Sequence, residues 1–255
     1  MTLLDNRANP KPLLVLLTVF LGGSAFSESQ EWIPVTNAMV SSPNPKPRVL
    51  LKCTNIQEWT CYTDSSSNMC ELVCQKRSLT NLNLGGLGKL QGLWCGDNSL
   101  TTLNLKPCPN LKSLYCWNNQ LTTLDLSGFA DLDTLHCWNN RLTKLDLNRC
   151  VTLSNLMCDA NQLENLDLSG HTNLYFLVCS GNRLTNLNVT GCTSLHTLVC
   201  AGNRLTGVLD LSTCTNLAGV NALNNSLTEI KLWDKNQLPA RYFYHDRGVS
   251  ITDGH

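Results

Sequence analysis

The sequence predicts a mainly-β solenoid of about eight coils with parallel strands. The prediction depends first on a pattern of leucines with one cysteine and one asparagine, LxxLxCxxNxLxxLxL, which occurs seven times. It depends next on the spacing, which is 21 residues five times and then 22 once, where an extra residue enters at Gly207-Val208. A coil this short leaves little room for a helix, so each is expected to hold one strand at LxC, a second short strand at LxL, and turns between them. The seven blocks begin at Leu90, Leu111, Leu132, Leu153, Leu174, Leu195 and Leu217.

Each column of the pattern has a physical reason. Leucines at repeat positions 1, 4, 11, 14 and 16, with cysteine at position 6, are expected to face inward, and one coil cannot bury them without a neighbour. A buried asparagine has two donors and an acceptor, enough to satisfy backbone groups of its own turn and the next. Position 9 is therefore expected to form a ladder of Asn98, Asn119, Asn140, Asn161, Asn182, Asn203 and Asn225.

An eighth, degraded copy precedes the seven blocks. Its phase is kept by Leu72, Cys74, Leu79, Leu82 and Leu84, whereas Arg77 replaces the asparagine. The repeats thus cover residues 69–237.

On these motifs the sequence resembles the bacterial leucine-rich-repeat class with 21-residue units, and within it a treponemal (spirochaete) leucine-rich-repeat protein. The resemblance covers the repeats, while segments 28–68 and 238–255 carry no motif of the class. It implies a leucine-rich-repeat solenoid that serves as a binding surface, with partners that differ between members.

The first 27 residues are predicted to be a signal peptide. Arg7 and Lys11 precede an apolar run over residues 13–21, and Ala25-Phe26-Ser27 offers small residues for cleavage. A run of nine to thirteen residues is too short to span a bilayer, which needs about 20. We therefore expect an exported protein without a membrane span, placed in the periplasm, on the outer surface or secreted.

The two ends of the solenoid are expected to be capped, because an open strand edge invites aggregation. Residues 28–68 are assigned to a linker and an N-terminal cap, with strand-like runs in RVLLKCT and EWTCYT. Residues 238–255 are assigned to a C-terminal cap. There Tyr242-Phe243-Tyr244, a turn at Asp246-Arg247-Gly248, and Val249-Ser250-Ile251 suggest a hairpin.

Charge and motifs argue against several function classes. With 19 basic and 19 acidic residues, the net charge is zero, whereas nucleic-acid or anionic-membrane partners call for a basic stripe. GxSxG, HExxH and phosphate-binding GxxxxGK[ST] motifs are absent. His136 and His196 lie three repeats apart, roughly 14 Å on a strand ladder, too far to share a metal. His171 is interpreted as a core histidine, and no enzyme activity, cofactor or metal is expected.

The 14 cysteines are interpreted mainly as packing residues. Seven of them share inward position 6, from Cys74 to Cys200, and Cys108, Cys150, Cys192 and Cys214 share a turn position. Their side chains run parallel in successive coils, which disfavours disulfide geometry, and buried free cysteine behaves as a small hydrophobe. Outside these columns, Cys53, Cys61 and Cys70 are open to one disulfide, with zinc as the weaker alternative.

Aromatic side chains gather where the repeat predicts an outer surface, at positions 5 and 7 of neighbouring copies. The pattern's packing requires none of them, and exposed aromatic clusters usually mark interaction surfaces. The alternative is that a cap covers the rings, or that they only stiffen cross-strand pairs by about 0.2–1 kcal/mol each. Tyr175 extends the group. The candidate partner-binding residues are Trp94, Tyr115, Trp117, His136, Trp138, Met157 and Phe176.

Two charged columns are weaker candidates. Arg141, Arg183 and Arg204 share position 10 and could serve an anionic glycan or an acidic patch. Asp residues stack at position 15 (Asp125, Asp146, Asp167), where a calcium row is conceivable. A solvated face is the preferred interpretation of both columns.

Together these features predict a non-enzymatic, extracytoplasmic scaffold that presents an aromatic, concave face to a protein partner, either a host or an envelope protein. The alternative is a carrier of a small apolar ligand or lipid on the same patch, and homo-oligomers are left open. A polysaccharide-active enzyme is disfavoured because Asp97, Asp133 and Asp159 come one to a repeat, without the clustered carboxylates that such chemistry needs.

Overall fold

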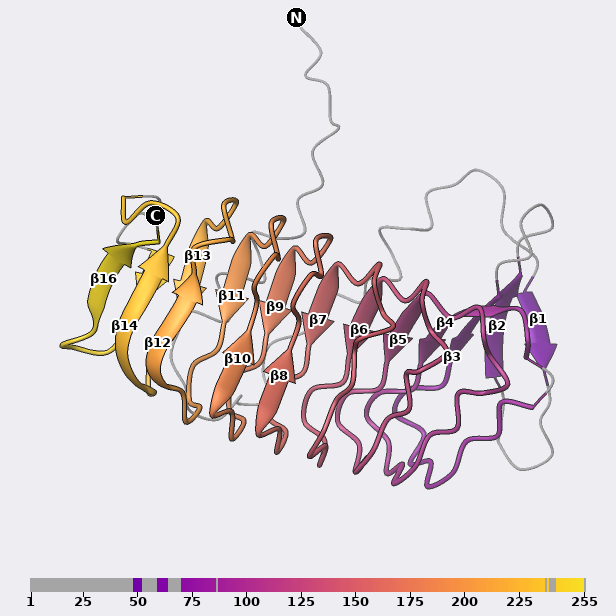
Figure 1. The fold of residues 1–255 in the computed structure, drawn as a ribbon. Helices are drawn as coiled ribbons and strands as arrows, with labels where there is room; N and C mark the ends of the chain where they lie inside the picture. The colour runs from indigo at the N-terminus through magenta and orange to yellow at the C-terminus, as the bar shows by residue number, and fades with distance from the viewer. Residues whose placement is uncertain are drawn as a thin grey trace, which may run out of the picture. The chain divides into compact units, whose positions relative to one another are not determined.

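The computed structural model describes residues 48–51, 59–63, 70–85, 87–236, 238 and 242–254, with side chains from Glu71 onward. Over this range the chain winds into a mainly-β solenoid of parallel strands, and the part described contains no helix long and apolar enough to cross a membrane (Figure 1). The predicted fold class is confirmed. The predicted signal peptide lies outside the described residues.

The main sheet runs the length of the solenoid and takes one strand from each coil. Its order is β1-β2-β3-β4-β5-β6-β7-β9-β11-β13-β15. β1 pairs antiparallel with β2 and β2 antiparallel with β3, and every later pair is parallel. The strands are β1 Arg48–Leu51, β2 Trp59–Thr63, β3 Cys70–Val73, β4 Leu90–Trp94, β5 Ser113–Tyr115, β6 Thr134–His136, β7 Asn155–Met157, β9 Phe176–Val178, β11 Thr197–Val199, β13 Gly219–Asn221 and β15 Phe243–Tyr244.

The second leucine segment forms strands only in the later coils. β8 (Asn165–Asp167) pairs with β10 (Asn186–Asn188), and β12 (Thr206–Leu211), β14 (Ser226–Leu232) and β16 (Ser250–Asp253) form a third sheet. The prediction of a strand at every LxL is therefore wrong for the earlier coils. In those coils the leucines of LxL are buried but their backbone is not paired as a strand, so side-chain packing holds the segment in place. The register of β12 against β14 shifts at Gly207/Val208, where the repeat is one residue longer.

The core lies between these sheets and is built from the predicted columns. Leucines at positions 1, 4, 11, 14 and 16 are at most 9% exposed wherever these positions hold leucine in the seven blocks. Because the strands are parallel and in register, each column stacks on itself, as Leu114 does on Leu135. Each coil therefore completes the apolar contacts of its neighbours, as the repeat requires.

The asparagine ladder forms as predicted. Asn140 is buried and donates through Nδ2 to the carbonyls of Cys137 in its own coil and Cys116 in the preceding coil, both at 3.0 Å. Its Oδ1 accepts the backbone N–H of Leu121 at 3.0 Å. One side chain thus satisfies backbone groups of two coils, and the same contacts recur along the column.

The two cysteine columns are packing columns. All eleven cysteines whose side chains are described are buried, and none of the eleven is in a disulfide. Burial raises the pKa of the Cys200 thiol to about 12 and that of Cys95 well above its usual range, so these thiols stay protonated. His171 replaces a cysteine of the turn column and is buried, with Nδ1 3.1 Å from the Leu168 carbonyl and Nε2 3.2 Å from that of Leu147. The side chains of Cys53, Cys61 and Cys70 lie outside the described residues.

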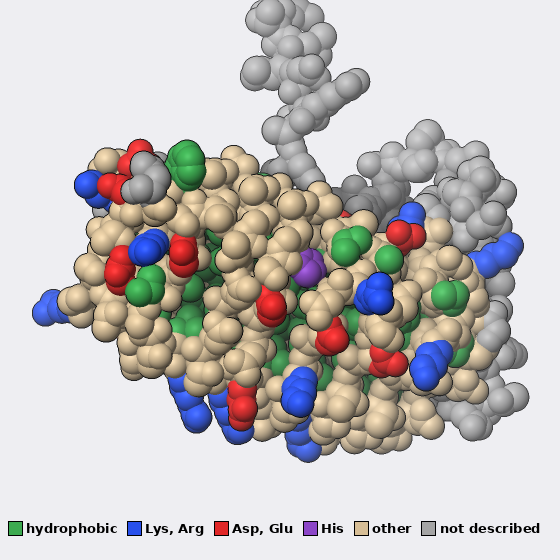
Figure 2. Space-filling model, in the orientation of Figure 1, with side chains coloured by type: hydrophobic (Ala, Val, Ile, Leu, Met, Phe, Trp, Pro, Cys, Tyr) green, Lys and Arg blue, Asp and Glu red, His purple; other side chains and the backbone are tan. Residues whose placement is uncertain are grey.

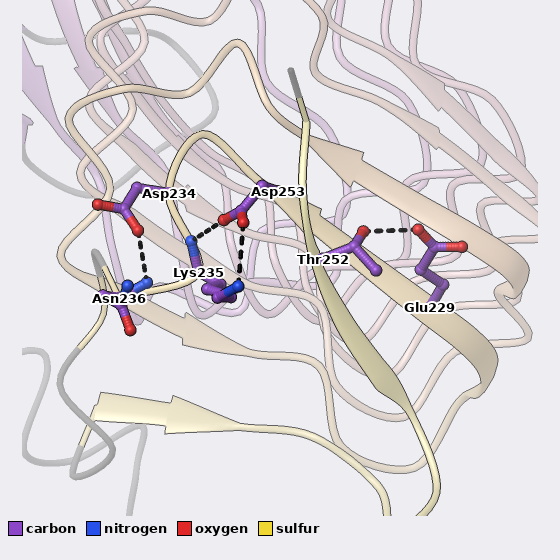
Figure 3. Close-up of polar contacts among 6 residues, drawn as sticks. All are labelled: Glu229, Asp234, Lys235, Asn236, Thr252 and Asp253. Atoms are coloured by element: carbon purple, nitrogen blue, oxygen red, sulfur yellow. Dashed lines mark hydrogen bonds and ion pairs between the residues drawn. The ribbon is translucent and has the colours of Figure 1, made fainter.

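The C-terminal segment continues the solenoid instead of forming the predicted hairpin. β15 adds to the main sheet beside β13, and β16 adds to the third sheet beside β14. Figure 3 shows the contacts that hold β16: Thr252 donates to Glu229 Oε1 at 2.6 Å, and Lys235 Nζ lies 3.2 Å from Asp253 Oδ2. The prediction of a hairpin was wrong because β15 and β16 are spaced like the two strands of one coil. Each pairs with the matching strand of the preceding coil and not with the other. The strand runs expected over 48–63 coincide with β1 and β2.

Candidate functional site

The candidate site lies on the outer face of the main sheet, the side that carries repeat positions 3, 5 and 7. Parallel register places Trp94 of β4 beside Tyr115 of β5, then His136 of β6, then Met157 of β7. Position 7 follows the strands, and backbone bonds such as Asn118 N to Trp138 O at 3.0 Å keep it in register. Alternating side chains of a strand point to opposite faces, so these residues are held outside the core by the pleat.

Five ring residues from positions 5 and 7 form one contiguous group, here called the aromatic cluster. Trp94 stacks on Tyr115, with ring centroids 5.0 Å apart and planes 13° apart. Trp117 stacks on Trp138 at 5.9 Å and 1°. Tyr115 also packs edge-to-face against Trp117 at 5.8 Å, and this contact connects the two stacks. A second edge-to-face contact at 4.9 Å adds His136 to the group. All five side chains are intermediate in exposure, so the rings support one another while part of each stays open to solvent.

Two glycines let the indoles lie close to the backbone. A Cβ added to Gly92 would come within 2.4 Å of the Trp94 ring. A Cβ added to Gly96 would come within 2.8 Å of three ring atoms of Trp117, so that ring lies over the Gly96 backbone. Neither contact could occur with a larger residue unless the indole moved. The sequence analysis missed these glycines, although Gly96 directly follows Trp94-Cys95 and Gly92 lies two residues before Trp94.

A polar ladder runs beside the rings at position 8. Asp97, Asn118 and Asn139 all have positive φ, at 48–55°, a backbone conformation that Asn and Asp tolerate better than most residues. Asn139 donates to Asn118 and Asn118 donates to Asp97, each at 2.6 Å. Asp97 Oδ2 also accepts from Trp117 Nε1 at a long 3.4 Å. The turns therefore fix the position 7 side chains relative to one another.

Two ring residues of the cluster have shifted pKa values. Burial lowers the pKa of His136 to about 4, opposed by a 3.1 Å hydrogen bond between its Nε2 and Asn155 Oδ1. Burial, followed by the Asp133 and Glu71 carboxylates, raises the pKa of Tyr115. Both groups are consequently neutral near pH 7, and the cluster carries no charge of its own.

The other predicted site residues are outside the five-ring cluster, and only Met157 is the direct strand neighbour of one of its rings. Met157 lies next to His136 in the position 5 column and is partly exposed. Phe176 is only 6% exposed, one strand further along in β9 at position 3, beside Asn155 and Thr197. Tyr175 is 39% exposed and stacks on His196 at 4.8 Å. Phe176 is therefore mostly covered, and Tyr175 belongs to a separate pair.

Asp159 and Ser180 continue the position 7 column beyond Trp138. Backbone bonds keep them in register, with Asn139 N to Asp159 O at 3.0 Å and Ala160 N to Ser180 O at 2.9 Å. Asp159 Oδ1 and Ser180 Oγ are buried and have no hydrogen-bond partner among the described residues. Burial raises the pKa of Asp159 to about 6. The sequence shows that an acidic residue follows two tryptophans at position 7. Only the structure shows that polar atoms of Asp159 and Ser180 are buried and unpaired among the described residues.

The arginine column is exposed to solvent. Arg141, Arg183 and Arg204 are exposed, and within the described residues none of them is within 4 Å of a carboxylate. Their backbone N–H groups bond to leucine carbonyls of the preceding coil. On the face drawn in Figure 2, several Lys and Arg side chains lie along the lower edge, and others lie among acidic side chains over the rest of the face. The exposure of the three arginines shows that the column is solvated.

The aspartates at position 15 have a structural role in turns. Asp125 accepts the backbone N–H of Ser127 at 3.1 Å, Asp146 that of Asn148 at 3.0 Å, and other coils repeat the contact. The hydroxyl and backbone N–H of Ser127 lower the pKa of Asp125. Side chains at this position stabilise turns of their own coil. Within the described residues, no group of three His, Cys, Asp or Glu side chains is arranged to hold a metal ion.

Comparison with known proteins agrees with the fold. The family model described as leucine-rich repeats in two copies matches residues 88–130. The functional domain of InlJ from Listeria monocytogenes, whose description includes a cysteine ladder, matches with 34% identity and a TM-score of 0.60, covering 70% of this chain and 44% of that one. YopM from Yersinia enterocolitica WA-314 matches with 24% identity and a TM-score of 0.55, covering 72% and 46%.

The chain spans less than half the length of either solved structure. No curated protein matches the sequence. The likeness to YopM concerns the fold alone. The fold is that of a leucine-rich-repeat solenoid of the kind found in these bacterial proteins, a scaffold commonly used to bind proteins.

Proposed function

We propose that this leucine-rich-repeat solenoid is a non-enzymatic protein-binding scaffold that acts outside the cytoplasm and contacts its partner through the aromatic cluster, with Met157 and Phe176 beside it. The observation that carries the proposal is the stack of Trp117 on Trp138 on the outer face of the main sheet. The core is already filled by the leucine and cysteine columns, so solenoid packing does not need these rings.

The cluster has the properties of a binding anchor. Its rings are locked by stacking, by the glycines beneath Trp94 and Trp117, and by the position 8 ladder. Little conformational entropy is therefore lost when a partner covers them, and such pre-organised aromatic side chains often dominate interface energetics.

The proposal includes the location of the protein and the class of its partner. The charged, apolar and small residues of segment 1–27 follow the order of a signal peptide and support export to the periplasm, the outer surface or the medium. The resemblance to treponemal proteins with 21-residue repeats supports a host or envelope protein as the partner. The exposed Arg141, Arg183 and Arg204 column would be a secondary contact, dependent on salt.

The alternative is a carrier that holds a small apolar ligand or lipid on the same rings. The geometry favours the scaffold, because most indole faces are already covered by one another and by glycine backbone. Of the indole faces of the aromatic cluster, among the described residues, only the Trp138 face turned away from Trp117 has neither a ring nor a glycine against it, so an apolar molecule larger than one ring would have to separate a stack.

A random peptide library panned on the full chain tests the proposal. We expect the wild-type chain to enrich peptides that a Trp117→Ala/Trp138→Ala variant does not retain. Trp233→Ala is the matched control, since Trp233 is 49% exposed in the turn after β14, away from the cluster. It should retain the same peptides.

Two outcomes would contradict the proposal. Peptides that bind the double variant as well as the wild type would place the binding surface elsewhere. A lipid that co-purifies with the wild-type chain in native mass spectrometry and is lost from the double variant would favour the carrier.

A further inference from the structure

We propose that the outer face recognises a positively charged side chain of the protein partner, an arginine above all, at Asp159 and Ser180 next to Trp138. This inference rests on the proposed function and adds the chemistry of the partner. It starts from two buried polar atoms that have no partner in the part of the chain that the structure describes, Asp159 Oδ1 and Ser180 Oγ.

Unpaired buried polar atoms are costly, which makes these two informative. Leaving a buried acceptor unsatisfied costs about 1–3 kcal/mol, and more if it is charged. Elsewhere the ladder satisfies its buried polar groups, as Asn140 and Asn161 show. Both residues are of intermediate exposure, so a rotation of each side chain would bring its unpaired oxygen to the surface, where a donor of the partner would remove this cost.

The column order places these atoms directly after an aromatic stack. Trp117, Trp138, Asp159 and Ser180 occupy position 7 in four successive coils, held in register by backbone hydrogen bonds. Adjacent strands lie about 4.8 Å apart, so a carboxylate, a hydroxyl and an indole come within the span of one side chain. Trp117 stacks on one face of the Trp138 ring, and no second ring of the described residues stacks on the opposite face.

A guanidinium group matches this set of neighbours. It is planar, stacks on aromatic faces, and carries five donors that suit a carboxylate. An ammonium group would satisfy the charge but not the stacking. A run of sugar rings fits less well, because sugars pack on open ring faces and most indole faces here are already covered.

The charges on the outer face are complementary to such a partner. From Glu71 to Leu223, positions 3, 5 and 7 contain two acidic residues, Glu71 and Asp159, and no lysine or arginine. At the margins, position 2 holds Lys112 and Asp133, and position 8 holds Lys76 and Asp97. His136 is neutral because burial lowers its pKa to about 4. Nothing basic therefore lies in the Trp138–Asp159–Ser180 column to repel a cation.

The experiment uses the peptides that the full wild-type chain selects from a random library. Sequencing should show arginine enriched among peptides that need Trp117 and Trp138, and no enrichment when Asp159→Asn is the target. For the tightest peptide, replacing its arginine by citrulline, a neutral group of nearly the same shape, should weaken binding to the wild type at least tenfold. The same replacement should change binding to Asp159→Asn by less than twofold.

Asp146→Asn is the matched control, because Asp146 lies on the other side of the coil and Asn can still accept the Asn148 N–H. It should behave as the wild type. Failure of this inference is distinguishable from failure of the proposed function. Peptides that need the tryptophans but show no arginine enrichment, or bind equally as citrulline forms, would overturn the inference alone. Peptides that ignore both the tryptophans and Asp159 would overturn both.

Discussion

Trp117 and Trp138, at the same repeat position in adjacent coils, lie with ring centroids 5.9 Å apart and ring planes 1° apart. The repeat phase alone predicts that they are neighbours, and the stack is closed on one side by the backbone of Gly96. Because the pair sits outside the core, it should be removable without loss of the fold.

The first prediction therefore concerns both tryptophans together. Trp117→Ala/Trp138→Ala should unfold in one cooperative transition in urea and bind a library-selected peptide about thirtyfold more weakly, a loss of about 2 kcal/mol. Calorimetric titration measures the binding. Arg183→Ala/Arg204→Ala should lose less, and that loss should fade with added salt. A double tryptophan variant that unfolds would mean that the rings act as core.

The second prediction tests the contact between the Trp117 ring and the backbone of Gly96. In Gly96→Ala the new methyl would meet the indole within 2.8 Å, so the ring must shift and the stack on Trp138 should be disturbed. Near-UV circular dichroism should lose intensity in the tryptophan region, with stability falling by about 1–3 kcal/mol. Gly128→Ala, where nothing lies within 4 Å of the added methyl, should leave the spectrum unchanged. Identical spectra for the two variants would contradict the close packing.

The third prediction concerns the asparagine ladder. Asn140→Ala and Asn161→Ala should each cost about 1–3 kcal/mol or more, because buried backbone groups of two coils lose their partners. Asn225→Ala should cost less, since Asn225 makes similar contacts but is partly exposed, so water can replace them. Urea unfolding measures the three values. Equal, negligible effects would show that the ladder faces solvent.

The fourth prediction concerns the thiols. If the column cysteines are packing residues, the unfolded chain should titrate with at least ten free thiols. In the native state they should react slowly, because burial holds the pKa of thiols such as Cys95 and Cys200 far above neutrality. Reaction with a coloured thiol reagent, with and without denaturant, gives both values. Five or more disulfides would be incompatible with the stacked columns.

The fifth prediction concerns pH and Asp159. The pKa of Asp159 is about 6 in the folded chain and near 3.8 in the unfolded chain, so the folded state binds the proton more tightly. The contribution of Asp159 to the free energy of unfolding therefore rises as the pH falls through 6. His136 has the opposite effect on stability: burial lowers its pKa to about 4, so its contribution to the free energy of unfolding falls as the pH falls. The inward thiols nearby, Cys158 and Cys179, stay protonated.

The comparison with Asp159→Asn isolates the aspartate. Between pH 7.5 and 4.5 the wild type should gain about 2 kcal/mol of unfolding free energy relative to the variant. Parallel urea titrations of both proteins across this range give the difference. A constant difference would show that the Asp159 carboxylate is not desolvated in the folded chain.

The local pattern determined most of this fold. Leucine at fixed positions, cysteine at position 6 and asparagine at position 9 each act within one or two coils, so period and phase are enough to predict parallel stacking, the buried columns and the pairing of Trp117 with Trp138. The same logic placed the outer face, because strand alternation decides which side a residue points to.

Only the tertiary structure decided the features that depend on several coils at once. The LxL segments pair as strands from β8 onward but not before, and the C-terminal segment adds two strands to separate sheets, where a hairpin was expected from its turn. The contact of Gly96 with Trp117 and the unpaired atoms of Asp159 and Ser180 depend on how neighbouring side chains cover one another. Repeat phase specifies which residues are neighbours. Whether a polar atom among them finds a partner depends on side-chain packing in three dimensions, and that decided where the candidate cation site lies.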